Sequence, residues 1–262
     1  GGADAIKHGV CANRLEPCFK KNSCCAKAIV KAGIKKVFIS SLDPNPNIKG
    51  KGIDFLKKQK IKVFHSLKST DRFKIINKFF YTRKTLNRPF ITLKIAISKN
   101  GFSKSPTHKN ITSHQTQYFM HSLRLSHDAI GVGMNTVLDD KPKLTCRLQG
   151  VSKNIAKLIF SNKEINFKNY KLVIVDYKKT VTENFSLFKK LKTQSILIEG
   201  GLNTFKYFLN CNLFDEVIVC QSNMTIKNAS KKYFLSMKSI TNNLILKSSF
   251  KYGEDMIYKF TN

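Results

Sequence analysis

Residues Gly131 to Arg147 read GVGMNTVLDDKPKLTCR, a passage from an apolar segment into a polar one. Two glycines open this passage, and glycine lets the backbone approach a ligand closely. An acid pair, Asp139 and Asp140, and an arginine follow, a combination that commonly orients a phosphorylated ligand. The pattern predicts a strand that runs into a ligand-binding loop. The alternative is a strand end followed by a solvated acidic turn, because a short motif is only a hypothesis.

Apolar segments alternate with polar segments on both sides of this passage. From Pro89 to the end of the chain, we expect short strands and two helices, at 114–125 and 203–209. Such alternation favours a largely parallel sheet with crossover helices, so the chain is predicted to be an α/β protein. The expected strands are 89–97, 129–133, 156–160, 172–175, 195–198, 216–220, 244–248 and 256–260.

The first third of the chain shows the same alternation. We expect helices at 24–33 and 53–59, strands at 36–40 and 61–65, and a proline-rich loop at 43–47. A basic helix at 70–85 follows. The chain is therefore predicted to form two domains, 1–69 and 88–262, joined by a connecting helix at 70–87.

Composition limits the function classes. The chain has 262 residues, of which 42% are hydrophobic, enough for a packed core rather than a disordered chain. The net charge of +31 is mostly lysine spread along the chain, and such charge supports only non-specific association, so we expect no specific nucleic-acid partner. There is no signal peptide and no apolar stretch of about 18 residues, so we expect no membrane partner and a cytoplasmic location.

A second glycine pair, Gly200 and Gly201, lies between an expected strand and an expected helix, with Thr204 on the first turn of that helix. Backbone N–H groups at a helix start attract anions, and glycine leaves these groups accessible. A simple tight turn is the alternative. The spacing is not that of the Rossmann fingerprint.

One charged residue, Lys94, interrupts the apolar strand expected at 89–97. A lysine within a strand usually marks a solvent-facing edge of a sheet. The alternative is a lysine that points into a pocket, where its ammonium group binds a phosphate or a carbonyl oxygen.

Four of the cysteines cluster near the start of the chain, and without a secretory signal a metal remnant is favoured over disulfides. Pro17-Cys18, followed by Cys24, resembles half of a zinc deaminase site. Such a site needs two thiolates and a histidine on Zn²⁺ and a glutamate that carries protons, in the pattern H-x-E followed by P-C-x-x-C. No H-x-E precedes Pro17, so a zinc-activated water would lack its proton carrier.

Taken in order, these segments resemble the bacterial bifunctional riboflavin-biosynthesis family, which pairs a pyrimidine deaminase with an NADPH-dependent reductase. The deaminase resemblance rests on 15–18, 24–29, 32–33, 43–47 and 50–52. The reductase resemblance rests on 89–94, Ser98, Gly101, 111–113, 123–124, 128–130, 136–138, Asp140, Pro142, 144–145, Arg147 and 199–201. It implies an α/β protein with a remnant of a cytidine-deaminase-like domain followed by a dihydrofolate-reductase-like reductase domain.

The resemblance also implies an activity and a site. A homodimer, joined through the reductase domain, would use NADPH to reduce the ribosyl group of 5-amino-6-(5-phosphoribosylamino)uracil to ribityl. The catalytic residues would be Lys94, Asp140 and Glu199. The cofactor-binding residues would be Ala96, Asn110, Thr136, Asp140, Asn162, Gly200, Gly201 and Thr204. The substrate-binding residues would be His108, Arg124, Leu144, Arg147 and Glu199, with the arginines suited to the phosphate.

The first domain departs from the family pattern. Asp4-Ala5-Ile6 stands where the family has His-Ala-Glu, and only Cys18 and Cys24 match zinc ligands. The deaminase part is therefore predicted to be inactive, with an incomplete zinc site. Two alternatives stay open. One is a complete deaminase/reductase whose amino terminus lies upstream of Gly1, and the other is a basic nucleic-acid-binding protein on a dead deaminase fold.

Overall fold

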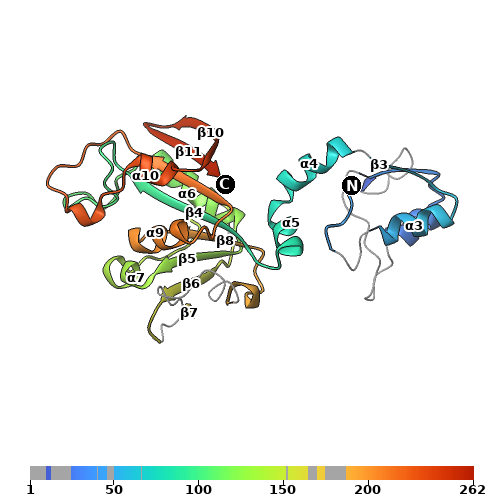
Figure 1. The fold of residues 1–262 in the computed structure, drawn as a ribbon, viewed down its shortest axis with the longest axis horizontal. Helices are drawn as coiled ribbons and strands as arrows, with labels where there is room; N and C mark the ends of the chain where they lie inside the picture. The colour runs from blue at the N-terminus through green and yellow to red at the C-terminus, as the bar shows by residue number, and fades with distance from the viewer. Residues whose placement is uncertain are drawn as a thin grey trace. The chain divides into compact units, whose positions relative to one another are not determined.

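The structure is a computed structural model that describes residues 10–12, 25–39, 41–45, 50–65, 67–151, 153–164, 170–174 and 187–262. The chain divides into two compact units, Gly1–Asn87 and Arg88–Asn262, coloured from blue to cyan and from cyan to red in Figure 1. Among the described residues, no helix has the length and apolar character that a membrane crossing requires.

Within the described residues, the first unit contains a three-stranded parallel sheet with the order β1-β2-β3. Exposed and buried residues alternate along β2 (Lys36–Ile39), as a strand with one covered face requires. Its buried Val37 and Ile39 pack with Leu56 in a small core. The other elements of this sheet and its core are β1 (Val10–Ala12), α2 (Cys25–Lys31), α3 (Lys51–Lys58) and β3 (Lys62–His65).

The continuous helix predicted at 70–85 was wrong, because this region forms two helices, α4 (Leu67–Ile76) and α5 (Lys78–Thr85). The break falls at Asn77, whose Nδ2 donates to the carbonyl oxygen of Phe73 at 3.2 Å. An asparagine side chain that bonds to the backbone competes with the helical hydrogen-bond pattern. The helix therefore ends and restarts at this residue.

The second unit is built, in its described part, on an eight-stranded sheet with the order β10-β11-β9-β4-β8-β5-β6-β7. The strands from β9 to β7 are parallel, whereas β11 is antiparallel to β9 and to β10. Figure 1 shows β4, β8, β5, β6 and β7 in this order across the sheet. The strands are β4 (Phe90–Ile97), β5 (Ala129–Gly133), β6 (Ala156–Ser161), β7 (Lys171–Ile174), β8 (Ser195–Glu199), β9 (Glu216–Gln221), β10 (Ile245–Tyr252) and β11 (Asp255–Thr261).

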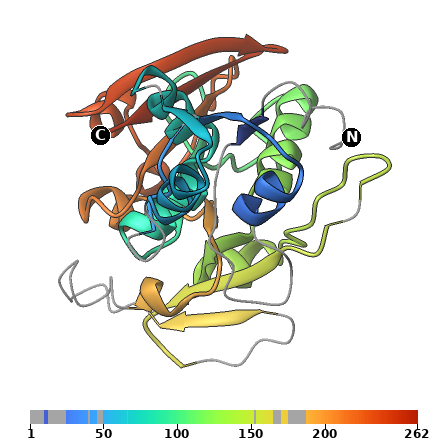
Figure 2. The same ribbon diagram turned by 90° about the vertical axis from the view of Figure 1, so that its right-hand side faces the viewer.

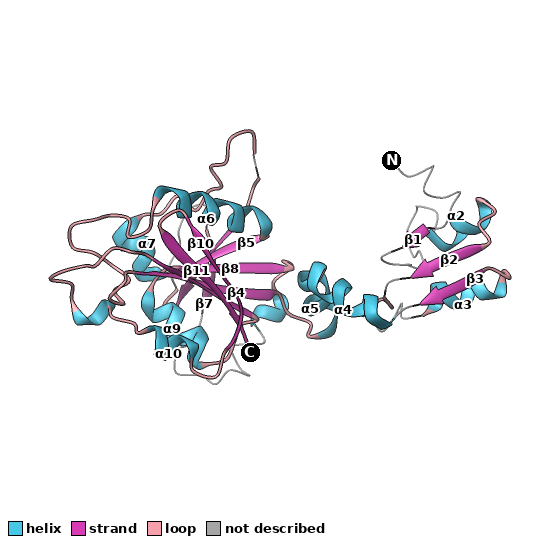
Figure 3. Cartoon of the chain, turned by 90° about the horizontal axis from the view of Figure 1, so that it is seen from above, coloured by secondary structure: helices cyan, strands magenta, loops and turns pink. Residues whose placement is uncertain are grey.

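Helices cover both faces of this sheet. They are α6 (His114–Ser126), α7 (Met134–Asp140), α9 (Leu202–Asn210), α10 (Met237–Thr241) and a 3₁₀ turn, η1 (Lys231–Tyr233). On one face Ile91 packs with Phe205 and Ile240 from α9 and α10. On the other face Val137 of α7 and Met120 of α6 belong to two separate core clusters. Figure 3 shows α6 and α7 on one side of the sheet and α9 and α10 on the other.

Helix α7 corrects the expectation that the first glycine pair leads into a loop or an acidic turn. β5 ends at Gly133, and α7 begins at the next residue. Carboxylates are unfavourable in the last turn of a helix, so Asp139 and Asp140 argue against a helix there. The helix ends at Asp140 and is followed by the capping residue Lys141, which has a left-handed φ of 41° and ψ of 54°. The prediction was therefore wrong about the local structure that carries the acid pair.

The structure excludes one of the two alternatives for Lys94, a position at the sheet edge. β4 lies in the interior of the sheet, hydrogen-bonded to β8 on one side and to β9 on the other. The hairpin formed by β10 and β11, red in Figure 2, lies beyond β9 at the sheet edge. Lys94 is only partly exposed.

An ion pair fixes the start of β4. Arg88 donates from Nη2 to Oδ1 of Asp215 at 2.8 Å and from Nη1 to Oδ2. The same Oδ2 accepts a hydrogen bond from the backbone N–H of Ile91 at 2.8 Å. The two side chains are only 9% and 14% exposed. The carboxylate of Asp215, just before β9, therefore fixes the first residues of β4 in position.

Candidate active site

The carboxyl ends of β4, β5 and β8 meet at one edge of the sheet. In the register, Lys94 of β4 lies beside Glu199 of β8, and Gly131 of β5 lies beside Ile198 of β8. The order of the strands changes direction here. β8 lies between β5 and β4, whereas the next strand along the chain, β9, lies on the other side of β4. Open α/β sheets bind their ligands beyond the carboxyl ends of strands at such a switch point.

Glu199, the last residue of β8, forms a bidentate ion pair with Arg124 of α6. The distances from Nε to Oε1 and from Nη2 to Oε2 are both 2.7 Å. The arginine and glutamate side chains are 15% and 9% exposed, so water screens the pair weakly. Burial lowers the pKa of Arg124, but hydrogen bonding and the charge of Glu199 outweigh burial and raise it overall. The structure thus brings two predicted substrate residues into direct contact.

The segment after α7 is fastened to α6 by two residues one helical turn apart. Arg124 donates from Nη1 to the carbonyl oxygen of Thr145 at 3.0 Å. The backbone N–H of Arg147 donates to Nδ1 of His121 at 3.3 Å. Leu144 has a left-handed φ of 46°, and its side chain is buried in the core beside β5. The Leu144 side chain therefore anchors this segment in the core.

Arg147 is an exposed residue. Among the described residues, no hydrogen bond or ion pair engages its side chain. Its backbone is held in place while its charge stays available. This combination suits the recognition of an anionic group on a ligand.

Sequence reasoning missed His121. The side chain is buried, with 9% exposure, and burial, followed by the charges of Arg124 and Arg147, lowers its pKa while Glu199 opposes the shift. A signal was available, because His121 precedes Arg124 by three residues on the expected helix, and such residues share a helix face.

Lys94 lies on the face of β4 that α6 covers, and Ala96 shares this face. Ala96 pairs in register with Cys220 of β9. Burial raises the pKa of the Cys220 thiol to about 11, and the charge of Lys94 opposes this rise. The ammonium group therefore acts on the covered face of the sheet, next to Glu199 in the register.

Two glycines and two threonines pack together where β5 and β8 end. A Cβ on Gly201 would lie 2.7 Å from Oγ1 of Thr136, and a Cβ on Gly133 would overlap Oγ1 of Thr204. Gly200 and Gly201 have φ values of 74° and 71°, which glycine adopts readily. The first backbone N–H groups of α9 have no partner within the helix, so this turn can receive an anion.

If the Gly200–Gly201 turn binds the cofactor phosphates, as the resemblance implies, Gly201→Ala should weaken cofactor binding by at least about tenfold. The added Cβ would displace Thr136, and a left-handed backbone strains alanine by about 1–3 kcal/mol. Gly150→Ala is the matched control, because Gly150 has the same φ of 71° with open space around its Cβ position. Titration of NADPH fluorescence measures the dissociation constants. Equal constants for the two variants would contradict a cofactor role for the Gly200–Gly201 turn.

Asp140 lies at the exposed end of α7. Lys104, in the segment after β4, approaches Asp139 at 3.4 Å and Asp140 at 3.8 Å. Burial lowers the pKa of Lys104, but the charges of Asp140, Tyr233 and Asp139 outweigh it and raise the pKa. The structure thus ties Asp140 to the segment after β4 rather than to the pair of Glu199 and Arg124.

The remaining predicted residues are dispersed. His108, Asn110 and Asn162 are exposed, and His108 forms a 2.8 Å hydrogen bond with Thr107 of its own loop. Asn162 follows the carboxyl end of β6. Within the described ranges, no hydrogen bond joins these three residues to Glu199.

The predicted zinc remnant, Cys18 and Cys24, lies outside the described residues. Among the residues that are described, no group of three or more His, Cys, Asp or Glu side chains could hold a metal ion.

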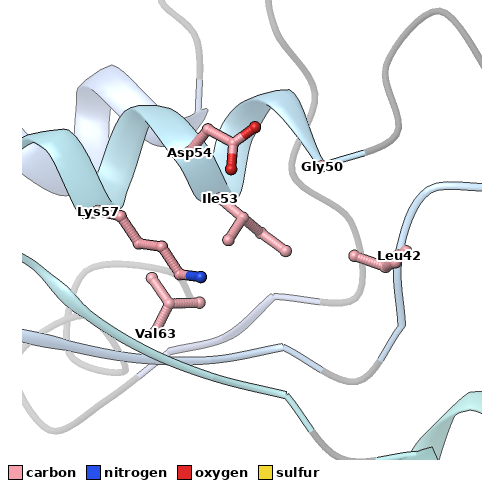
Figure 4. Close-up of a pocket in the computed structure, with 6 residues that line it drawn as sticks. All are labelled: Leu42, Gly50, Ile53, Asp54, Lys57 and Val63. Carbon is pink, nitrogen blue, oxygen red and sulfur yellow. The ribbon is translucent and has the colours of Figure 1, made fainter.

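The first unit has an open cavity of about 290 Å³, drawn in Figure 4. Its lining residues come from α3, from β3 and from the segments before α3. They are Leu42, Gly50, Ile53, Asp54, Lys57 and Val63. None of the residues predicted to bind substrate or cofactor lines this cavity.

The chain matches known proteins over both units. Residues 89–258 match the family model of the RibD C-terminal domain. The "Riboflavin biosynthesis protein RibD" of Aquifex aeolicus is 29% identical over 94% of this chain and 78% of its own length. The protein of the same name from Buchnera aphidicola is 30% identical over 84% of this chain and 71% of its own length.

Solved structures support the architecture. A Thermotoga maritima structure described as a diaminohydroxyphosphoribosylaminopyrimidine deaminase/5-amino-6-(5-phosphoribosylamino)uracil reductase has a TM-score of 0.77 and 24% identity, covering 95% of this chain and 78% of that one. At this identity the likeness concerns the fold alone, and it confirms the expected α/β fold with a dihydrofolate-reductase-like second unit. With the glycine turn, Arg124 and Glu199 gathered in that unit, the chain belongs to the RibD family, through a RibD C-terminal domain at residues 89–258.

Proposed function

We propose that this chain is a reductase of riboflavin biosynthesis that uses NADPH to reduce 5-amino-6-(5-phosphoribosylamino)uracil to its ribityl product. One observation carries this proposal: within a RibD C-terminal domain, the buried pair of Glu199 and Arg124 adjoins the Gly200–Gly201 turn. Polar groups for a substrate and an anion site for a cofactor therefore adjoin each other.

The residues at the ends of β5 and β8 fit a nicotinamide cofactor. Gly133 and Gly201 leave no room for a Cβ, so backbone comes close to the hydroxyl groups of Thr136 and Thr204. The N–H groups at the start of α9 would bind the cofactor phosphates. We propose Ala96, Asn110, Asp140 and Asn162 as further cofactor-side residues. When bound, NADPH supplies a hydride to the ribosyl C1 of the substrate.

The charged residues around Glu199 fit the substrate. The guanidinium of Arg147, an exposed residue, would bind the substrate phosphate, and Arg124 would orient Glu199 toward the substrate. The ring oxygen of the ribosyl group must gain a proton as the sugar opens. Lys94, half-buried beside Glu199 in the register, would donate that proton as a general acid. His108 would contribute to substrate binding directly, and Leu144, whose side chain is buried, would contribute by positioning the segment that bears Arg147.

We further propose that residues 1–69 form a deaminase-like domain, joined through 70–87 to a reductase domain at 88–262. Residues 1–69 contain no H-x-E motif, so these residues by themselves do not supply the glutamate that would carry protons for a zinc-bound water. We also propose a homodimer through the reductase domain. A cytoplasmic location would suit a reaction between NADPH and a phosphorylated metabolite.

We expect the purified chain to oxidise NADPH when the deaminated substrate is added. Loss of absorbance by NADPH measures this activity, and mass spectrometry of the product should show a gain of two hydrogens. A folded chain that shows no turnover with this substrate would contradict the proposed function. Absence of turnover with the amino-bearing precursor would support the loss of deaminase activity.

A further inference from the structure

His121 connects helix α6 to the segment that bears Arg147. Its Nδ1 accepts the backbone N–H of Arg147 at 3.3 Å, and its carbonyl oxygen accepts the Cys146 thiol at 3.5 Å. One turn later on the same helix, Arg124 holds both the Thr145 carbonyl oxygen and the carboxylate of Glu199. The segment at the phosphate end of the proposed site is therefore held in place by two side chains of α6, those of His121 and Arg124.

The geometry fixes the protonation state of this histidine. A backbone N–H can only donate, so Nδ1 of His121 must be unprotonated and the ring neutral with its hydrogen on Nε2. We propose that His121 is a positioning residue, whose unprotonated Nδ1 fixes the backbone of Arg147 and thereby the phosphate-binding end of the site. This inference rests on the proposed function, because Arg147 is assigned there to the substrate phosphate.

The charges around the ring favour this neutral state. Arg124 on α6 and Arg147 on the following segment oppose protonation, whereas Glu199 on β8 and the backbone of Thr145 favour it. The Cys146 thiol also faces His121. Burial is the largest influence, and together with the two arginines it holds the pKa of His121 below its ordinary value of 6.5.

Acidification should break the hydrogen bond between Nδ1 of His121 and the backbone N–H of Arg147. When His121 gains a proton, Nδ1 becomes a donor and can no longer accept the N–H of Arg147. A group whose pKa is lowered on folding contributes stability at neutral pH and loses it as the pH falls through the lowered pKa. The affinity for the substrate should therefore fall with pH below the ordinary histidine value, through KM rather than kcat.

The test compares three variants of the full chain. His121→Leu removes the acceptor and should raise KM on the order of tenfold at neutral pH with kcat nearly unchanged. His121→Asn supplies an amide oxygen that accepts at any pH, so it should keep a near-normal KM at neutral pH and a flatter KM profile in acid. His114→Asn is the matched control, because His114 is an exposed histidine on the same helix.

Steady-state kinetics at saturating NADPH, from about pH 5 to about pH 8, gives the profiles. The substrate phosphate titrates near pH 6 in every variant, so the difference between wild type and His121→Asn isolates the histidine. Identical profiles for these two proteins would overturn the inference. If wild type shows no turnover, the proposed function fails instead. NMR titration with inorganic phosphate then tests the inference, which requires weaker binding by His121→Leu than by His114→Asn.

Discussion

Replacing Glu199 with alanine is expected to lower kcat/KM by at least about 100-fold. Glu199 accepts two charge-assisted hydrogen bonds from Arg124, and each bond to a charged group contributes about 1.5–3 kcal/mol. The substitution leaves the guanidinium of Arg124 without its carboxylate partner, although the arginine side chain is only 15% exposed. The guanidinium can then bind elsewhere in the site. Both the proposed contact of the glutamate with the substrate and the position of Arg124 would be lost. Steady-state NADPH oxidation measures the effect.

Two further variants separate charge from shape. Glu199→Gln keeps an oxygen that can accept from Arg124 but removes the carboxylate charge, so we expect an intermediate loss of activity. Glu254→Ala, at an exposed position in the β10–β11 turn, makes the same change in net charge and should keep full activity. A soluble, folded Glu199→Ala protein with activity within about threefold of wild type would exclude Glu199 from the site, since a charged hydrogen bond contributes more than that.

Replacing Asp215 with alanine is expected to lower the free energy of unfolding by about 3–5 kcal/mol, the usual cost of removing one partner from a buried ion pair. The carboxylate binds Arg88 twice and also accepts the N–H of Ile91. Its loss leaves a guanidinium that is 9% exposed and a strand N–H without their carboxylate acceptor. Urea denaturation followed by circular dichroism measures the change.

Asp71→Ala provides the matched control. Asp71 pairs with Lys74 at 3.3 Å, but the side chains are 80% and 43% exposed. An exposed pair three residues apart on a helix contributes about 0.2–0.5 kcal/mol. A similar midpoint shift for Asp71→Ala and Asp215→Ala would contradict the importance assigned to burial of the Arg88 pair.

The sequence predicted the sheet well because periodic apolar segments reflect burial. β5 was predicted with its observed bounds, and β8 differed only by including Glu199. The errors have local causes. Asn77 splits a helix by bonding to the backbone, and α7 forms although it ends in two carboxylates. Packing of Val137 against the sheet overrides the unfavourable charges in α7.

The site was harder to predict than the fold. A resemblance can mark Arg124 and Glu199 separately, but only the folded chain shows that they bind one another. The only sequence signal for His121 was its position three residues before Arg124, because its proposed role depends on a hydrogen bond to a backbone N–H rather than on a motif. The sequence left two positions possible for Lys94, at a sheet edge or in a pocket. The strand order excludes the edge, because β4 lies inside the sheet.

The late insertion of β8 between β4 and β5 has a consequence for folding kinetics. As the ribosome delivers the second unit, β4 through β7 emerge before β8, and the strand that joins β4 to β5 is missing until residues 195–199 arrive. Contacts between segments so distant in sequence slow folding, and unpaired strand edges expose the intermediate to aggregation. A nascent chain that stops before Ser195 therefore has two open edges where Lys94 and Glu199 later meet.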